Sequence, residues 1–221
     1  MPETPHSREW YTRLAHDLGG YGHAWTRVLS GPDPELTFDL TLAGLLTPQT
    51  WVLEAGCGHG PDAARFGPQV RQWTAYDFVP ALLEQARRNA PQVSLVLWDG
   101  KGKRPTALHG SFDLIVSRRG PTSVILRLPE LAAPGARFLY VGPRLDVPQV
   151  PRRLDSVGWT ITSEWRVSVL AHAPTREDWQ SRCDSMGEEA SREDWAVRAT
   201  AAGMPYREER YVVLAQPAGM N

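Results

Sequence analysis

The sequence predicts an α/β fold in which helices wind over both faces of a doubly wound, mostly parallel β-sheet. Strand and helix patterns alternate from Val52 to Val141, as they do in such sheets. The stretch Phe112–Ser117 is apolar enough to be a central strand, covered on both faces. A glycine-rich turn joins the first strand of the region to the helix that follows it, which places a ligand-binding feature at the start of the sheet.

Composition limits the class of protein. The chain has 221 residues and is 42% hydrophobic, which suits one large globular domain. No apolar run approaches the roughly 20 residues of a membrane-spanning helix. The N-terminal residues show no signal-peptide pattern, so we expect a cytoplasmic protein that does not engage a membrane. The formal charge of −1 gives no global attraction for nucleic acid, which disfavours RNA only weakly.

Metal and nucleophile signatures are missing from the sequence. The two cysteines, Cys57 and Cys183, form no metal-binding or disulfide pattern, and Cys57 lies inside the glycine turn as a small space-filling residue. The six histidines show no i,i+4 spacing, and no G-x-S-x-G pattern occurs. We therefore expect no metal centre and assign no catalytic residue.

The glycine turn is the most informative stretch. Trp51–Leu53 predicts a short buried strand, Gly56, Gly58 and Gly60 follow it, and Pro61 begins a helix. Glycine allows unusual backbone angles and lets a ligand lie against the main chain. A helix N-terminus adds unpaired N–H groups and a partial positive charge. This combination predicts a nucleotide cradle.

The spacing and the nearby acids narrow the ligand. The pattern is G-x-G-x-G and not the G-x-G-x-x-G of dinucleotide-binding proteins, which argues against a nicotinamide-dependent dehydrogenase. Glu54, two residues before the first glycine, would repel a pyrophosphate and suit a cation. Asp77 closes the next predicted strand, where a carboxylate can accept hydrogen bonds from ribose hydroxyls.

Four motifs in this order resemble those of class I S-adenosylmethionine-dependent methyltransferases. They are Glu54–Gly60, Tyr76–Asp77, Trp98–Gly100 and Phe112–Ser117, and the match runs from about Leu46 to Gly142. The resemblance implies a Rossmann-like, seven-stranded sheet whose C-terminal strand, Tyr211–Ala215, inserts antiparallel. It implies S-adenosylmethionine as cofactor and S-adenosylhomocysteine as product.

The resemblance also suggests which residues bind the cofactor. Asp99 would reach the adenine amino group, although an Asp-Gly pair is also a common turn former. The full predicted cofactor set is Glu54, Gly56, Cys57, Gly58, Gly60, Asp77, Phe78, Asp99, Gly100 and Ser117.

Acceptor-binding candidates come from two places. Arg118 and Arg119 follow the fourth strand, where the pocket should open, but a structural ion-pair role is the alternative for both. The N-terminal helices, expected at Ser7–Gly19, Tyr21–Leu29 and Glu35–Leu46, could cover the methionine end of the cofactor. Within them Tyr21 and Trp25 are the candidates, with simple packing against the sheet edge as the alternative.

We therefore expect one methyltransferase domain over residues 1–221. It comprises an N-terminal helical cap (1–47), a cofactor-binding core (48–145) and a C-terminal substrate-side part (146–221) with an insertion at about 171–205. The expected activity is methyl transfer to a small-molecule acceptor. The alternatives are a methyltransferase-like protein that binds the cofactor without turnover, and a methyltransferase acting on RNA or protein. The sequence leaves the acceptor atom, any general base and the oligomeric state open.

Overall fold

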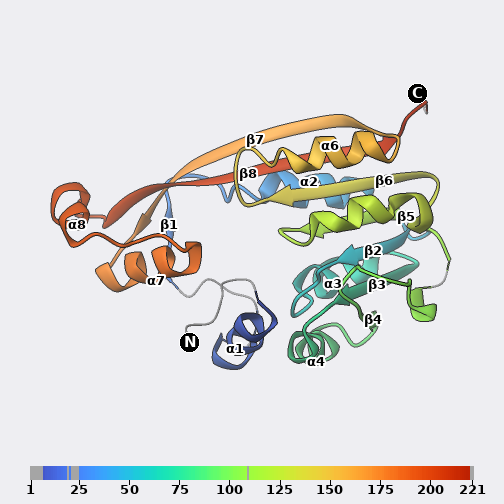
Figure 1. Ribbon diagram of the computed structural model, residues 1–221, viewed down its shortest axis with the longest axis horizontal. Helices are drawn as coiled ribbons and strands as arrows, with labels where there is room; N and C mark the ends of the chain where they lie inside the picture. The colour runs from blue at the N-terminus through green and yellow to red at the C-terminus, as the bar shows by residue number, and fades with distance from the viewer. Residues whose placement is uncertain (1–6, 19, 21–24, 109, 220–221) are drawn as a thin grey trace.

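The computed structural model describes residues 7–18, 20, 25–108 and 110–219 and contains one eight-stranded sheet (Figure 1). Its strand order is β1-β7-β8-β6-β5-β2-β3-β4. Neighbours from β4 to β6 pair in parallel, whereas β8 pairs antiparallel with both β6 and β7. The strands are β1 (Val28–Leu29), β2 (Trp51–Ala55), β3 (Gln72–Asp77), β4 (Ser94–Leu97), β5 (Phe112–Arg118), β6 (Ala132–Gly142), β7 (Trp159–Ala173) and β8 (Met204–Pro217).

The doubly wound fold and the antiparallel C-terminal strand are confirmed, and the strand count is one higher than predicted. Tyr211 to Ala215 lie within β8, opposite β6. The extra strand is β1, where the sequence suggested a helix over Tyr21–Leu29. Val28 pairs with His172 near the end of the 15-residue β7, so an extended partner offered by tertiary structure overrides the weak helical pattern there.

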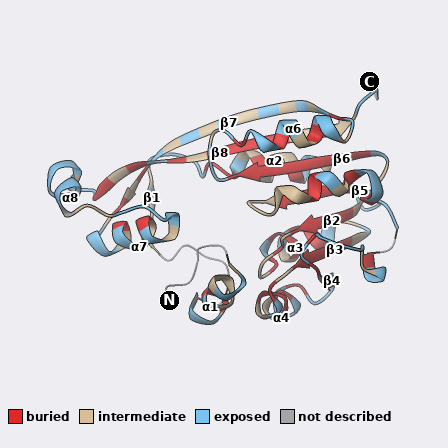
Figure 2. Cartoon of the chain, in the orientation of Figure 1, coloured by how far each residue is buried: buried red, intermediate tan, exposed pale blue. Residues whose placement is uncertain are grey.

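Helices cover both faces of the sheet. One face packs against α2 (Leu36–Leu45), α3 (Pro61–Phe66) and α4 (Pro80–Asn89) through a cluster that includes Phe38, Phe66 and Leu83. The other packs against the 3₁₀ helix η3 (Thr122–Arg127), α5 (Leu128–Leu131) and α6 (Gln149–Ser156). Figure 2 shows buried residues concentrated in the central strands between these layers. Burying both faces of the parallel strands explains why their sequences are continuously apolar.

The remaining helices lie at the periphery. Helix α1 (Arg8–Leu18) packs against α4, and short 3₁₀ helices occur at η1 (Gly67–Gln69) and η2 (Thr106–Leu108). Helices α7 (Arg176–Met186) and α8 (Arg192–Arg198) lie between β7 and β8 in the chain, at the end of the β7–β8 pair opposite the C-terminus (Figure 1). Thr175 begins α7 with a capping box formed with Asp178. No helix of the described residues is long and apolar enough to cross a bilayer.

Candidate functional site

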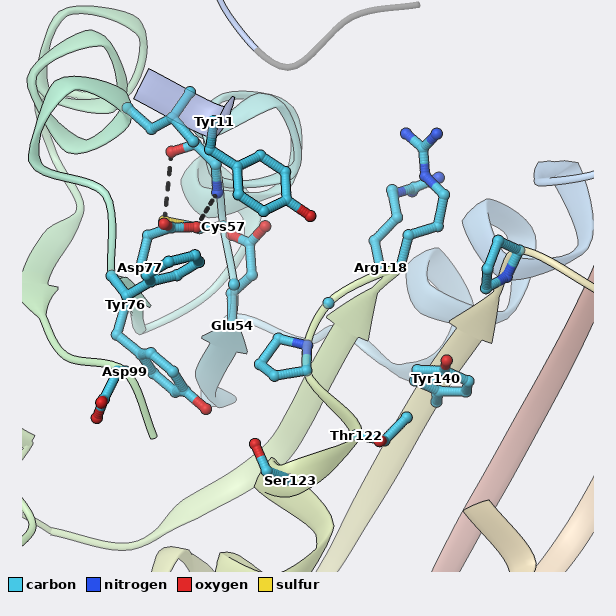
Figure 3. A pocket seen from close by; sticks show the side chains of 18 of the residues that line it. Tyr11, Glu54, Cys57, Tyr76, Asp77, Asp99, Arg118, Thr122, Ser123 and Tyr140 are labelled. Atoms are coloured by element: carbon cyan, nitrogen blue, oxygen red, sulfur yellow. Dashed lines mark hydrogen bonds between the residues drawn. The ribbon is translucent and has the colours of Figure 1, made fainter. Parts of the chain in front are cut away.

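A cavity of about 980 Å³ opens at the carboxyl ends of the parallel strands. Its walls come from the segments that follow β2, β3, β4, β5 and β6, and α1 contributes Arg8 and Tyr11. In Figure 3, Tyr76 and Asp99 lie at one end of this pocket, and Arg118 and Tyr140 lie at the other. The position agrees with the crevice that open α/β sheets form beyond their strand ends.

The glycine turn has the backbone conformation that its sequence suggested. Gly56, Gly58 and Gly60 have φ angles of 72°, 56° and 77°, in the left-handed region that favours glycine. A Cβ on Gly56 would lie 2.6 Å from Cδ of Pro121, so this approach excludes any larger residue. Gly56, Cys57 and Gly58 line the cavity. Gly60 does not, and its role is to let α4 pack closely, because a Cβ there would lie 3.1 Å from Cβ of Ala86.

Asp77 organises the turn as well as facing the cavity. Its Oδ2 accepts a hydrogen bond from the Gly58 backbone N–H at 2.9 Å, and its Oδ1 accepts one from Val79 at 2.9 Å (Figure 3 draws the first). Burial raises the pKa of this carboxyl, although the backbone donors oppose the shift. Each oxygen keeps a further lone pair, so the geometry is compatible with hydrogen bonds to a ribose. Phe78, the next residue, also lines the cavity.

Asp99 both forms a turn and lines the cavity, so the two alternatives considered for it occur together. Asp99 Oδ1 accepts a hydrogen bond from the Lys101 backbone N–H at 2.8 Å, as in a turn, and Asp99 also lines the cavity. Beside it, the hydroxyl of Tyr76 is buried without a hydrogen-bond partner among the described residues, and burial raises the pKa of this phenol. A buried orphan hydroxyl on a cavity wall is costly unless a ligand satisfies it, which fits a purine with several polar edge atoms.

Besides Gly60, two further predicted cofactor residues, Gly100 and Ser117, lie outside the lining. Gly100 has a φ of 76° and shapes the turn after β4. Ser117 is fully buried, and its Oγ donates a hydrogen bond to the Ala55 carbonyl at 3.3 Å. Neither residue lines the cavity, so the structure gives both a supporting position and no direct contact with its contents.

Glu54 and Asp62 place negative charge on one wall of the cavity. Glu54 is 3% exposed, and its Oε2 accepts a hydrogen bond from Nε1 of Trp73 at 2.9 Å. Burial, and then the charge of Asp62, raise the pKa of Glu54 well above its ordinary value. Burial also raises the pKa of Asp62 against the opposing effect of Arg118. A bound cation would favour the ionised form of these two buried carboxyls.

Arg118 has the structural role that the sequence left as an alternative. Its Nε lies 2.7 Å from Asp62 Oδ2, its Nη1 lies 2.7 Å from Glu35 Oε2, and its Nη2 pairs with Asp39. Its guanidinium also lies over the Phe38 ring, 4.4 Å from the centroid. With all three nitrogens held by carboxylates, Arg118 is not available to grip an acceptor. These ion pairs favour the structural alternative over an acceptor contact for Arg118, which also lines the cavity.

Strand parity explains the orientation of Arg118. Side chains alternate between the faces of a strand, so Arg118 shares a face with Leu114 and Val116, beneath α2 and α3. Arg119 departs from this alternation, because its φ of 52° makes it the one non-glycine residue in the left-handed region among those the structure describes. Its Nε lies 3.2 Å from Glu35 Oε1, and the residue lines the cavity. The proposed acceptor contact of Arg119 therefore stays a prediction.

The N-terminal acceptor candidates receive no support. Tyr21 lies outside the described residues. Trp25 donates a hydrogen bond from Nε1 to the Tyr206 hydroxyl at 3.4 Å and does not line the cavity. Trp25 therefore packs against the sheet, which is the alternative considered for the N-terminal segments.

Several residues that line the cavity lie outside the four motifs and were not predicted from the sequence. Three more lie after β5 or in β6, namely Thr122, Ser123 and Tyr140, and another group, which includes Asp146 and Gln149, follows β6. The rule that pockets form after the carboxyl ends of parallel strands could have found the β6 group. Arg8 and Tyr11 of α1 gave no such signal, because only tertiary packing brings them to the cavity.

Known proteins resemble this chain in sequence and in fold. A family model described as a methyltransferase domain matches residues 52–133. The protein-L-isoaspartate O-methyltransferase of Gloeobacter violaceus is 29% identical over 167 residues, which cover 74% of this chain and 73% of that protein. A solved structure of a functionally unknown protein from Deinococcus radiodurans R1 is 69% identical, with a TM-score of 0.89 over 95% of this chain and 99% of the other.

A putative methyltransferase from Bacillus halodurans shares the fold at 16% identity and a TM-score of 0.59, covering 80% of this chain and 96% of that one. The glycine turn, Asp77 and Asp99 lie around one cavity, and the methyltransferase-domain match and the similar methyltransferases support a class I S-adenosylmethionine-dependent methyltransferase. Its cofactor is S-adenosylmethionine, and the acidic wall, the orphan Tyr76 hydroxyl and the glycine turn fit that group.

Proposed function

We propose that this methyltransferase modifies a small molecule bound in the same cavity as the cofactor. The observation that carries the proposal is the size and extent of the cavity. At about 980 Å³ it is at the upper end of the range for sites that hold one drug-sized ligand, so room remains for a second small molecule. It continues past the glycine turn and Asp99 to Tyr140 and Gln149, which are not needed for the cofactor motifs.

Different residues would bind different parts of the cofactor. Asp77 would accept hydrogen bonds from the ribose, Asp99 and Tyr76 would meet the adenine, and Glu54 with Asp62 would face the cationic methionine end. The cofactor supplies a methyl group already activated by its sulfonium. The chain then has to align the acceptor with that methyl and exclude water, which is the main contribution of a protein to such a displacement.

Two groups define the chemistry available to the acceptor. Burial raises the pKa of Tyr140 to about 12, so this phenol stays protonated at neutral pH and serves as a hydrogen-bond donor. Arg119 offers a positive charge at the end of β5. A small acceptor with an anionic or hydrogen-bond-accepting group suits this half of the cavity better than a cation does.

The test is a methyl-transfer assay with three classes of acceptor. The protein is incubated with S-adenosylmethionine and, separately, a small-metabolite extract, bulk RNA and an isoaspartyl peptide, the last because of the name of the similar Gloeobacter protein. We expect S-adenosylhomocysteine release together with a new methylated compound, found by mass spectrometry, in the metabolite arm alone. Methylation confined to RNA or peptide would overturn the proposal, and cofactor binding without transfer in any arm would favour the non-catalytic alternative.

A further inference from the structure

The buried guanidinium of Arg118 links three acidic residues, and they depend on it unequally. Glu35 is also paired with Arg119 at 3.2 Å and with Arg210 at 2.8 Å. Asp39 is also paired with Arg65 of α3. Asp62 has Arg118 as its one ion-pair partner among the described residues. Removing the charge of Arg118 therefore leaves Glu35 and Asp39 with other cations and leaves Asp62 with none.

Asp62 is the member of this group that faces the cofactor cavity. It is 5% exposed, it lies in the first turn of α3, and it lines the cavity together with Glu54. The charge of Asp62 disfavours ionisation of Glu54, the charges of Asp39 and Glu35 disfavour ionisation of Asp62, and the charge of Arg118 favours ionisation of both Glu54 and Asp62. The acidic wall of the cavity is thus backed by the guanidinium of Arg118, which also lines the cavity and whose three nitrogens are each paired with a carboxylate.

We propose that Arg118 is a positioning residue for the cofactor, which fixes the Asp62 carboxylate and favours the ionised form of the Glu54–Asp62 pair toward the cationic end of S-adenosylmethionine. The inference rests on the assigned cofactor and is independent of the acceptor. Arg118 would touch neither cofactor nor acceptor. It would act through Asp62, so its loss should change how cofactor affinity depends on pH and not merely lower the stability of the fold.

The direction of the pH effect follows from electrostatics. A carboxylate must be ionised to attract the cofactor's positive charge, so affinity rises as pH rises through the pKa values of the pair. Without Arg118 those pKa values move higher, because burial and the repulsion from neighbouring carboxylates remain while the compensating cation is gone. The other charged or polar groups that act on the site are Glu35 at the N-cap of α2, Asp39 on α2, Arg65 on α3, Trp73 and Asp77 on β3, Arg119 directly after β5 and Arg210 on β8.

The experiment compares Arg118→Met with Arg65→Met by calorimetric titration with S-adenosylmethionine at several values of pH. Methionine keeps apolar contact with Phe38 and removes the charge. Arg65 is a matched control, since it pairs with the same Asp39 but has a side chain 60% exposed and is not paired with Asp62. We expect Arg118→Met to weaken binding by about tenfold or more near neutral pH, with partial recovery at alkaline pH. Arg65→Met should leave both affinity and pH profile unchanged.

Several outcomes separate this inference from the assignments that it builds on. If the wild-type protein fails to bind the cofactor, the cofactor assignment itself fails. If Arg118→Met lowers the melting temperature but leaves the affinity or the shape of its pH profile unchanged, the role is structural and the proposal is wrong. Should that variant not fold, Asp62→Asn provides the test. It should weaken binding and flatten the pH profile, and unchanged binding by folded Asp62→Asn would overturn the proposal.

Discussion

Glu54 shows how one residue can lower stability while it serves a ligand. A carboxyl whose pKa is raised in the folded state contributes stability that is complete below its ordinary pKa of about 4.5 and is lost as pH rises through the raised value. At neutral pH the ligand-free protein therefore carries a cost at Glu54, which a bound cation would offset. Natural proteins commonly accept such costs at functional sites.

Glu54→Gln should accordingly stabilise the ligand-free protein and weaken cofactor binding. Gln can still accept the Trp73 hydrogen bond while it lacks the buried charge. We expect a higher melting temperature than wild type at neutral and alkaline pH, with the difference vanishing in acid. Calorimetry should show about tenfold to hundredfold weaker S-adenosylmethionine binding, from loss of a charge-assisted contact. Equal stability at all pH values would contradict the buried charge assigned to Glu54.

Asp77→Ala should reduce cofactor affinity by at least about tenfold, because the ribose contacts are charge-assisted hydrogen bonds worth about 1.5–3 kcal/mol each. Asp77 also accepts two backbone hydrogen bonds, so a structural loss must be separated from a binding loss. Asp113→Ala is the control, because Asp113 accepts a backbone hydrogen bond from Trp51 at 2.8 Å without lining the cavity. Unchanged affinity in folded Asp77→Ala would remove Asp77 from the site.

At the scale of elements, α1 forms a wall of the cavity that none of the four motifs includes. The Tyr11 ring meets the Phe78 ring edge-on, with centroids 5.8 Å apart, and Arg8 lies 5.9 Å from the Phe78 centroid. Because Phe78 directly follows Asp77, these contacts connect the N-terminal helix to the cofactor side of the pocket. The N-terminal cap stays a prediction, and Arg8 and Tyr11 of α1 are its residues that line the cavity.

Tyr11→Ala should weaken cofactor binding about threefold to tenfold, in line with an aromatic contact of about 0.5–1.5 kcal/mol. Arg13→Ala, on the same helix, is the matched control, since Arg13 is 52% exposed, pairs with Asp17 and does not line the cavity. Both variants would be measured by the same calorimetric titration. Equal affinities for the two would show that α1 does not contribute to the cofactor site.

The α7 insertion should behave as a separate element. Thr175→Ala removes a capping box and should destabilise the protein by about 1 kcal/mol, measured by chemical denaturation. No described residue of α7 or α8 lines the cavity, so cofactor affinity should stay at the wild-type value. A clear loss of affinity would mean that the insertion reaches the site in solution.

Across the whole molecule, a buried ionic network joins the two halves of the sheet. It runs from Asp62 through Arg118, Glu35 and Arg210 to Glu208, with Arg27 at 3.2 Å from the last. Arginines on both sides lower the pKa of Glu35 to about 2, so this carboxylate stays ionised throughout the physiological range. The network links the cofactor wall to β8, the antiparallel strand that completes the sheet.

The sequence by itself determined the fold and the centre of the cofactor site, because both depend on local patterns. Strand and helix periodicity predicted the doubly wound sheet that the structure has. The glycine spacing predicted a turn with unusual backbone angles, and its glycines do have positive φ. Asp77 and Asp99 could be placed because each directly follows or closes a strand, and parallel strands bring their carboxyl ends together.

Tertiary structure decided the residues whose role depends on partners far away in the chain. Arg118 looked like an acceptor contact from its place at a strand end, yet its carboxylates are 56, 79 and 83 residues away in sequence. In the same way, Trp25 was assigned to the pocket but meets Tyr206, 181 residues further on. Periodicity shows which face a side chain occupies, whereas the charge that it meets there depends on how the helices pack over that face.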